Sequence, residues 1–404
     1  MPRLVIAASY APSIASSRGT LLWRFVQHGW QVAALAPFSS QPAARETLQA
    51  LDVQCVDWSV DRRGASILRD YASFAAFLAV LRSLEPDAVL YYHLKPILYG
   101  TAASIVAGTR TRCALMTGIG ALSRMRDYSD RWQTLYLRYP YFAAIAALMR
   151  ANDVVVCQNP DDLRFLYDST CISPTARAEV VAGSGVNLER YHYVENTPGK
   201  GISFLMITRL LGSKGVNEFI EAALEVGRRN PDTSFHLVGR VETGRDAILV
   251  DDLLRKVDGS TIHYHAPIDD VRPIIAECNV FVLPSYYGEG IPRTILEAMS
   301  MGRPVITADS PGCRETVVPG ENGYLVPPRD VGALVEAMER LVLQRDLIPT
   351  MGRRSRRMAE RRFDVRTVDE RMFRVIASTA CARSGARTRG ARARRAVSRA
   401  LTAR

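Results

Sequence analysis

The sequence predicts an α/β chain of two doubly wound, Rossmann-like domains, and three observations support that class. The chain has 404 residues, more than the roughly 150–250 at which single domains usually stop growing. Short β-branched runs alternate with longer helical segments, the pattern of βα units with a parallel sheet. With 48% hydrophobic and 23% charged residues, the composition is that of a globular protein and excludes disordered and collagen-like classes.

Two series of buried-looking runs define the expected strands. The first series is Arg3–Ala8, Gln31–Leu35, Ala88–Tyr92, Arg112–Met116 and Asp153–Cys157, with a helix near Gly19–Gly29. The alternation pauses near residue 195, where Asn, Pro and Gly accumulate, and then begins again. The second series is Ile202–Ile207, Ser234–Val238, Thr261–His265, Val280–Leu283 and Pro304–Thr307.

These series divide the chain into five expected parts. Residues 1–192 form the first domain, 193–201 a linker and 202–362 the second domain. Residues 363–380 form a helix that crosses back to the first domain, and 381–404 a disordered basic arm. Two such domains leave a cleft between them, and parallel sheets bind ligands beyond the carboxyl ends of their strands.

The net charge of +11 is concentrated at the end of the chain. Residues 340–404 contain 19 Arg, no Lys and 5 acidic residues, a balance of +14, which leaves −3 for the rest. Three interpretations of the arm stay open: a solvated tail, attraction to anionic lipid, and RNA binding.

Cysteine usage and hydropathy indicate the compartment. The seven Cys residues form no CxxC pair, which favours a reducing environment over a disulfide framework or zinc site. The apolar run at the N-terminus is too short for a signal peptide, and no uncharged apolar stretch approaches the roughly 18 residues that span a bilayer. We therefore expect a cytoplasmic protein.

The segment Pro284–Met299 joins an expected strand to a helix through a Gly-rich loop. The helix should begin close to Ile291, with Pro292 in its first turn, where a missing N–H is not needed. The free N–H groups of a helix start suit a phosphate. Glu289 and Glu297 are expected to bracket an elongated ligand by accepting from hydroxyl pairs. The simpler interpretation is that both are solvated charges at the helix entry.

A second strand-to-helix segment, Met206–Val216, contains two cations. Arg209 and Lys214 flank a turn with Gly212 and Gly215, so they converge at one strand end. Two cations suit a diphosphate and the charge that develops when it leaves. The alternative is a pair of ordinary surface cations.

Together the two segments resemble the C-terminal half of family-4 retaining glycosyltransferases, nucleotide-sugar enzymes of the GT-B fold. Their E-x7-E element appears as Glu289–Glu297 and their R-x4-K-G element as Arg209–Gly215. Weaker similarity in the first half, at 89–100 and 116–120, is to bacterial members that build lipid-linked or surface glycans. The resemblance covers about residues 3–345.

The resemblance implies a role for each matched side chain. Arg209 and Lys214 would bind the donor diphosphate, Glu297 the ribose hydroxyls, and Glu289 the hydroxyls of the transferred sugar. The catalytic set is then Glu289, Arg209 and Lys214. Family membership also implies retention of anomeric configuration, with the leaving diphosphate accepting the acceptor's proton.

Backbone groups complete the implied donor site. The N–H groups of Gly290 and Ile291 would contact the sugar or distal phosphate. Gly19, in the loop after the first strand, would let the backbone approach the phosphates closely. The chain has no D-x-D element, so no metal and no other cofactor is expected.

The first domain departs from the family at one position. Many members have a His at the end of the fifth strand, where this chain has Thr117 and Gly118. Contacts to the acceptor or sugar are expected from these two residues and from His93 and Lys95. A structural hydrogen-bonding role for His93 stays open.

The expected function is a hexosyltransferase that moves a sugar, with UDP as the expected nucleotide, to a lipid-linked or polysaccharide hydroxyl. The alternatives are a nucleotide-sugar 2-epimerase of the same architecture and a basic-tail nucleic-acid-binding protein. Arg124–Arg150 mixes Arg with Trp132 and four Tyr, which suits a membrane interface. With the basic arm, it would hold the protein against anionic lipid at the cytoplasmic face of the inner membrane. The alternative for this segment is an amphipathic helix packed on the sheet.

Overall fold

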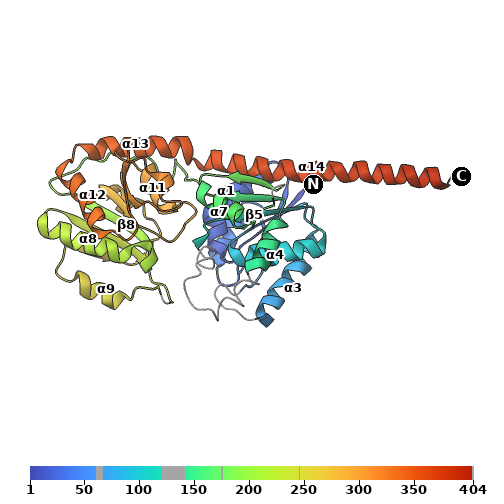
Figure 1. The fold of residues 1–404 in the computed structure, drawn as a ribbon, viewed down its shortest axis with the longest axis horizontal. Helices are drawn as coiled ribbons and strands as arrows, with labels where there is room; N and C mark the ends of the chain where they lie inside the picture. Colours follow the sequence, from blue (N-terminus) through green and yellow to red (C-terminus); the bar gives the residue numbers. More distant parts are fainter. Residues whose placement is uncertain (61–66, 121–141, 174–175, 245, 403–404) are drawn as a thin grey trace. The chain divides into compact units, whose positions relative to one another are not determined.

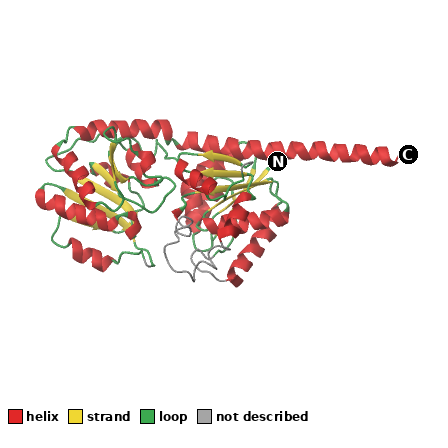
Figure 2. Cartoon of the chain, in the orientation of Figure 1, coloured by secondary structure: helices red, strands yellow, loops and turns green. Residues whose placement is uncertain are grey.

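The computed structural model describes residues 1–60, 67–120, 142–173, 176–244 and 246–402, with side chains as far as Arg383. The chain forms two compact units, each built on its own parallel sheet (Figures 1 and 2). The first comprises Met1–Thr117, Leu122–Val181 and Asp369–Arg404, and the second Gly118–Ala121 and Ala182–Val368. Two Rossmann-like α/β sheets confirm the predicted fold class.

The first unit has a seven-stranded sheet in the order β3-β2-β1-β4-β5-β6-β7. Its strands are β1 Arg3–Ala7, β2 Gln31–Ala36, β3 Gln54–Asp57, β4 Ala88–Tyr92, β5 Thr111–Met116, β6 Val154–Cys157 and β7 Arg177–Val180. The central strand β4 is buried at all of its residues, as expected when helices cover both faces of a parallel sheet. The covering helices are α1 Ala11–Gln27, α2 Pro42–Gln49, α3 Ile67–Leu84, α4 Leu94–Ala107 and α7 Pro160–Asp168.

The position expected for Gly19 was wrong. Helix α1 begins at Ala11 with Pro12 in its first turn, so Gly19 lies inside the helix and not in a loop. Proline suits the first turn of a helix, and no breaker follows it before Gly19. A Cβ added at Gly19 would lie 3.5 Å from Leu51 Cδ1, an ordinary contact, so no close backbone approach requires glycine there.

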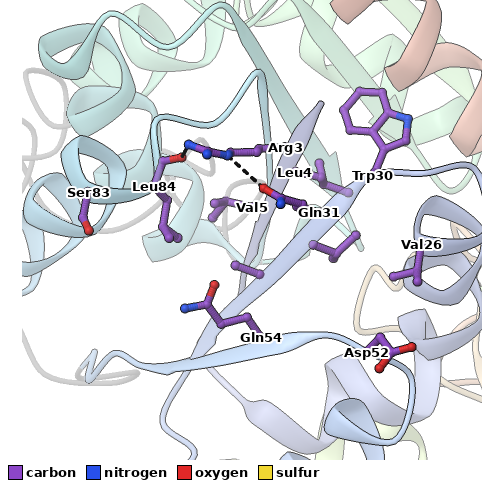
Figure 3. A pocket seen from close by; sticks show the side chains of 12 residues that line it. Arg3, Leu4, Val5, Val26, Trp30, Gln31, Asp52, Gln54, Ser83 and Leu84 are labelled. Carbon is purple, nitrogen blue, oxygen red and sulfur yellow. Dashed lines mark hydrogen bonds between the residues drawn. The ribbon is translucent and has the colours of Figure 1, made fainter. Parts of the chain in front are cut away.

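A cavity of about 520 Å³ lies at the amino-terminal ends of β1, β2 and β3 (Figure 3). Its one arginine, Arg3, is engaged by the protein itself. Arg3 Nε donates to Gln31 Oε1 at 3.0 Å and Arg3 Nη1 donates to the carbonyl of Leu84 at 2.9 Å. These bonds join β1 to β2 and to the end of α3, so the charge serves the packing of this edge.

The second unit has a six-stranded sheet in the order β10-β9-β8-β11-β12-β13. Its strands are β8 Ser203–Arg209, β9 Ser234–Arg240, β10 Ile262–His265, β11 Val280–Leu283, β12 Val305–Ala308 and β13 Gly323–Val326. Its helices are α8 Val216–Arg229, α9 Val250–Val257, α10 Arg272–Glu277, α11 Arg293–Ser300, α12 Val331–Leu343 and α13 Leu347–Arg362. The strand order reverses between β8 and β11, which makes their carboxyl ends the topological switch point.

Aromatic packing fixes helix α8 on this sheet. The helix buries Val216, Phe219 and Ile220 on one face, the spacing of an amphipathic helix. The Phe204 and Phe235 rings stack with centroids 5.2 Å apart, and Phe219 meets Phe235 edge-on at 6.3 Å. Strands β8 and β9 and helix α8 therefore share one aromatic core.

The segment expected as a linker, residues 193–201, is part of the second unit. Asn196 is 1% exposed, and its amide donates to the carbonyl of Asn279 at 2.9 Å. Arg303, 2% exposed, donates to the carbonyls of Val194 at 2.6 Å and Cys278 at 2.8 Å. Asn196, one of the residues that suggested a linker, is therefore used for a buried hydrogen bond.

Helix α14 spans Val365–Thr402, and from Asp369 onward it belongs to the first unit. Thr20 Oγ1 donates to Asp369 Oδ2 at 2.6 Å, the Phe373 ring contacts that of Phe25 at 4.8 Å, and Arg383 pairs with Asp153 at 2.7 Å. The helix continues through the basic arm, for which we expected no regular structure. Ala and Arg, which dominate that segment, are both strong helix formers.

The predicted membrane segment lies largely outside the described residues. Its residues 124–141 are not among them, whereas 142–150 are helical and bury Ile145 and Met149. No helix in the described ranges is both long enough and apolar enough to cross a bilayer.

The aromatic core makes a stability prediction. Phe235→Ala removes the ring that Phe204 and Phe219 both contact, and we expect the second unit to lose about 3–5 kcal/mol of unfolding free energy. Urea-dependent hydrogen exchange at β8 and β9 measures the loss. The control is Leu343→Ala, because Leu343 is 80% exposed and its truncation should cost less than about 0.5 kcal/mol. Equal effects of the two substitutions would contradict the prediction.

Candidate active site

The candidate site is formed by the loops that follow β8 and β11 at the switch point of the second sheet. Arg209 is the last residue of β8, and Lys214 ends the short 3-10 turn Gly212–Lys214 that leads into α8. Glu289 lies in the loop between β11 and α11. Because β8 and β11 are adjacent parallel strands, their carboxyl ends meet at the same edge of the sheet.

One glycine allows the two loops to meet. Gly215 has φ +79°, and a Cβ there would lie 2.4 Å from the carbonyl oxygen of Pro284, closer than any side chain permits. The backbone N–H of Tyr286 donates to the carbonyl of Ser213 at 3.0 Å. The β8 loop and the β11 loop are therefore held together through their main chains.

Lys214 and Glu289 form a direct ion pair across the two loops. Lys214 Nζ donates to Glu289 Oε1, and Ser285 Oγ donates to the same oxygen at 3.2 Å. The side chain of Lys214 is 5% exposed and that of Glu289 is 20% exposed. Burial of the carboxylate opposes its ionisation, but the charge and hydrogen bond of Lys214, with Arg209 and Ser285, outweigh burial and lower the pKa of Glu289.

Tyr287 joins the two predicted cations. Lys214 Nζ lies 4.8 Å and Arg209 Cζ 5.9 Å from the centroid of the Tyr287 ring, within the range of cation–π attraction. Arg209 Nη1 also lies 3.8 Å from Glu242 Oε1. Arg209 and Lys214 thus converge as predicted, and they are not independent surface cations.

Helix α11 carries the second carboxylate. It begins at Arg293 after Pro292 as the N-cap, two positions later than expected because the proline takes the extended cap conformation. Glu297 is 5% exposed and accepts from Arg293 Nε at 2.9 Å and from the Tyr191 hydroxyl. Burial raises the pKa of Glu297 and outweighs these two donors. Neither Glu289 nor Glu297 is a fully solvated charge.

The Gly118–Gly120 segment lies against the Glu289 loop within the second unit. Gly120 N–H donates to the carbonyl of Gly288 at 3.2 Å. A Cβ on Gly118 would lie 2.7 Å from the Gly288 oxygen, and one on Gly120 2.2 Å from the Tyr287 oxygen. The main chain occupies this position so closely that a histidine would not fit at residue 118.

The other predicted residues are buried or lie elsewhere. Gly290 and Ile291 are buried in the loop before α11. In the first unit, His93 caps α4 with φ +70°, and its Nδ1 lies 3.1 Å from Ser9 Oγ. Lys95 forms an ion pair with Asp70 at 3.0 Å. Thr117 is the last residue of the first chain segment of that unit, Met1–Thr117. The hydrogen bond between His93 and Ser9 is consistent with a structural role for His93.

Sequence reasoning did not single out Ser285, Tyr287, Tyr191 or Glu242. The first two lie in the loop after β11, where the two consecutive Tyr residues that end two positions before Glu289 were a usable signal. Tyr191 and Glu242 lie far from the motifs in sequence and become partners only through the fold.

The arrangement suits a reaction in which a diphosphate is the leaving group. Two cations at a strand end can hold a diphosphate and offset the charge it gains on leaving. A carboxylate kept ionised beside them can accept hydrogen bonds from the hydroxyls of an attached group.

Comparison with known proteins agrees with this chemistry. Residues 201–344 match the protein family described as "Glycosyl transferases group 1". The chain is 28% identical over 311 residues to the N,N'-diacetylbacillosaminyl-diphospho-undecaprenol alpha-1,3-N-acetylgalactosaminyltransferase of Campylobacter jejuni, covering 74% of this chain and 78% of that protein. It is 25% identical over 303 residues to the UDP-Gal:alpha-D-GlcNAc-diphosphoundecaprenol alpha-1,3-galactosyltransferase of Escherichia coli, covering 69% and 72%.

Solved structures share the fold. Anabaena HepE in complex with UDP and glucose aligns with a TM-score of 0.75 at 16% identity over 94% of this chain and 100% of that one. The sucrose-phosphate synthase of Thermosynechococcus elongatus aligns with a TM-score of 0.75 at 18% identity over 95% and 100%. Residues 201–344, within the second unit, are a group 1 glycosyltransferase domain. The chain is a glycosyltransferase with two Rossmann-like domains.

The Lys214–Glu289 pair predicts a pH-dependent stability. The pKa of Glu289 is lower in the folded chain, so the pair stabilises the fold above the ordinary Glu pKa and loses this effect as pH falls through the folded value. Lys214→Met should raise the pKa of Glu289 and cost about 3 kcal/mol near neutral pH, because a buried charge loses its partner.

Urea unfolding of the second unit between pH 7 and pH 4 measures this loss, which should shrink on acidification. Lys256→Met is the matched control, because Lys256 is exposed on α9. A loss that is independent of pH would argue against the ion pair.

Proposed function

We propose that the chain transfers a hexosyl group from a nucleotide diphosphate sugar, UDP being the expected nucleotide, to a hydroxyl of a lipid-linked glycan with retention. The observation that carries the proposal is the meeting of Arg209, Lys214 and Glu289 at the switch point of the second sheet. Because Lys214 is paired with the carboxylate of Glu289, an entering diphosphate can replace that carboxylate as the partner of the lysine.

In this proposal, Lys214 and Arg209 bind the donor diphosphate. Lys214 turns from Glu289 to a phosphate oxygen, which releases Glu289 to accept from the hydroxyls of the sugar. The backbone N–H groups of Gly290 and Ile291 contact the sugar or the distal phosphate. Glu297, placed beside Tyr191 and Arg293, accepts from the ribose hydroxyls.

The transfer breaks the bond between the anomeric carbon and the diphosphate oxygen. The acceptor oxygen then bonds to that carbon from the same face through an oxocarbenium-like state, and its proton passes to the leaving diphosphate. Arg209 and Lys214 offset the charge on the diphosphate. No side chain is assigned as a nucleophile.

The names of the relatives support the proposed classes of donor and acceptor. The Escherichia coli relative is named for UDP-Gal and a diphosphoundecaprenol acceptor, and the Campylobacter jejuni relative for a diphospho-undecaprenol acceptor. We propose the same classes here, with His93, Lys95, Thr117 and Gly118 as contacts to the acceptor or sugar. A peripheral position at the cytoplasmic face of the inner membrane would bring the protein to such an acceptor.

The proposed donor contacts predict separate effects on catalysis. Lys214→Ala should lower kcat/KM about 10²- to 10³-fold, because a positioned charge on the leaving group is lost. Glu297→Gln should act mainly through a higher KM for the donor. Transfer from radiolabelled UDP-sugars to membrane lipid extract measures both effects.

Lys256→Ala, an exposed change outside the site, should leave transfer unchanged. Full transfer activity in Lys214→Ala would refute the site. Turnover that does not need the lipid extract would favour an epimerase.

The two cations also predict metal independence. Since Arg209 and Lys214 offset the diphosphate charge in the proposal, EDTA should leave the transfer rate unchanged. Activity lost in EDTA and restored by Mn²⁺ would show that the cations do not suffice.

A further inference from the structure

A second basic site lies on the second unit, away from the candidate active site. It is a groove of about 510 Å³ between helix α13 and the turn before β13. Four arginines line it, Arg354, Arg357, Arg361 and Arg362, with Met358 and Glu321. The turn before β13 lies at the amino end of that strand. Because the strands of this sheet are parallel, the groove lies at their amino ends, whereas the loops after β8 and β11 lie at their carboxyl ends.

Buried hydrogen bonds make the floor of the α13 groove rigid. Asn322 is 1% exposed; its amide donates to the carbonyl of Thr316 at 3.0 Å, and it accepts from the N–H of Val318 at 2.8 Å. The hydroxyl of Ser355, fully buried on α13, donates to the carbonyl of Asn322 at 3.3 Å. Helix and turn are thus joined beneath the arginines.

The arginines of α13 fall into two groups. Arg356 donates to the carbonyls of Tyr191 and Ser300 at 3.1 and 2.8 Å, Arg353 lies 4.0 Å from Glu195, and Arg362 pairs with Glu315 at 3.3 Å. These three are engaged by the protein.

The second group is Arg354, Arg357 and Arg361, for which no ion pair exists within the described part of the chain. They are exposed, and their spacing of three and four residues sets them along one face of the helix. Arg3, in the cavity of the first unit, is by contrast hydrogen-bonded to its own lining.

The repulsion among these three arginines has an energetic cost that helix α13 offsets only at its C-terminus. Like charges three and four residues apart destabilise a helix by a few tenths of a kcal/mol per pair. The partial negative charge at the C-terminus of α13 stabilises Arg361, which lies in the last turn. This attraction does not extend beyond the last turn, so it does not stabilise Arg354 or Arg357. One acid, Glu321, lies on the lining, so the groove keeps an excess of positive charge.

We propose that the α13 groove binds a phosphate-bearing anion, either a free diphosphate or the phosphate of an anionic lipid headgroup. Guanidinium forks match phosphate oxygens two at a time and are weakly hydrated, which suits a shallow, rigid groove. Met358 and Val318 give the arginine stems an apolar floor. The site does not depend on the proposed transferase activity.

The test compares two triple variants of the full chain. The groove variant is R354Q/R357Q/R361Q. The control is R228Q/R255Q/K256Q, which removes the same number of exposed cations from α8 and α9 of the same unit. Calorimetry with inorganic pyrophosphate, in excess UDP to fill the donor site, tests the free anion. Flotation with phosphatidylglycerol vesicles, against phosphatidylcholine vesicles, tests the lipid source.

We expect the groove variant to bind one of the two probes at least about tenfold more weakly than the wild type, and the control to match the wild type. Loss with pyrophosphate identifies a free phosphate ligand, and loss with phosphatidylglycerol identifies a headgroup. Equal weakening in both variants would reflect net charge alone and overturn the proposal, as would unchanged binding in the groove variant.

R354K/R357K/R361K keeps the charge and protects the test against misfolding of the glutamine variant. It should bind more weakly than the wild type because ammonium groups lack the fork. Wild-type affinity in this variant would also overturn the proposal. Transfer activity should persist in all three variants, so a failure here is separable from a failure of the donor site.

Discussion

The parallel pairing of β8 with β11 is the constraint on which the candidate site depends. The chain passes from β8 to β9 and β10 on one side of the sheet and continues through β11, β12 and β13 on the other. The loops after β8 and β11 therefore share the switch point. This pairing brings Lys214 into contact with Glu289 across 75 positions of sequence. Without it, the two motifs would be separate surface loops.

The ion pair also explains how the fold tolerates a buried lysine at this position. Lys214 is almost completely buried, and a buried charge without a partner is strongly destabilising. Glu289 supplies the counter-charge and stays ionised in return. In the proposed reaction, a phosphate oxygen takes the place of this carboxylate beside Lys214, and the carboxylate then accepts from sugar hydroxyls. Glu297 is paired with a partly exposed cation, Arg293, and burial outweighs this pairing and raises the pKa of the carboxyl.

The sequence predicted those features that local patterns encode. Strands β4 and β11 have the predicted bounds because they are short apolar runs buried on both faces. Strands β3 and β7 were not predicted, since each has polar residues and lies at a sheet edge. The motifs located Arg209, Lys214, Glu289 and Glu297, but their partners depend on contacts between distant loops. Gly19 was predicted to lie in a loop because Pro12, which favours the first turn of a helix, was not interpreted as the start of α1.

The return of α14 to the first unit has a consequence for synthesis of the chain. The first unit is interrupted after Val181 and completed only from Asp369 onward, whereas the second unit is nearly continuous. On a ribosome, residues up to Val368 emerge before the helix that covers Phe25 and Thr20. The first unit can therefore finish folding only after the second unit has been synthesised, although most of its residues precede the second unit in the chain.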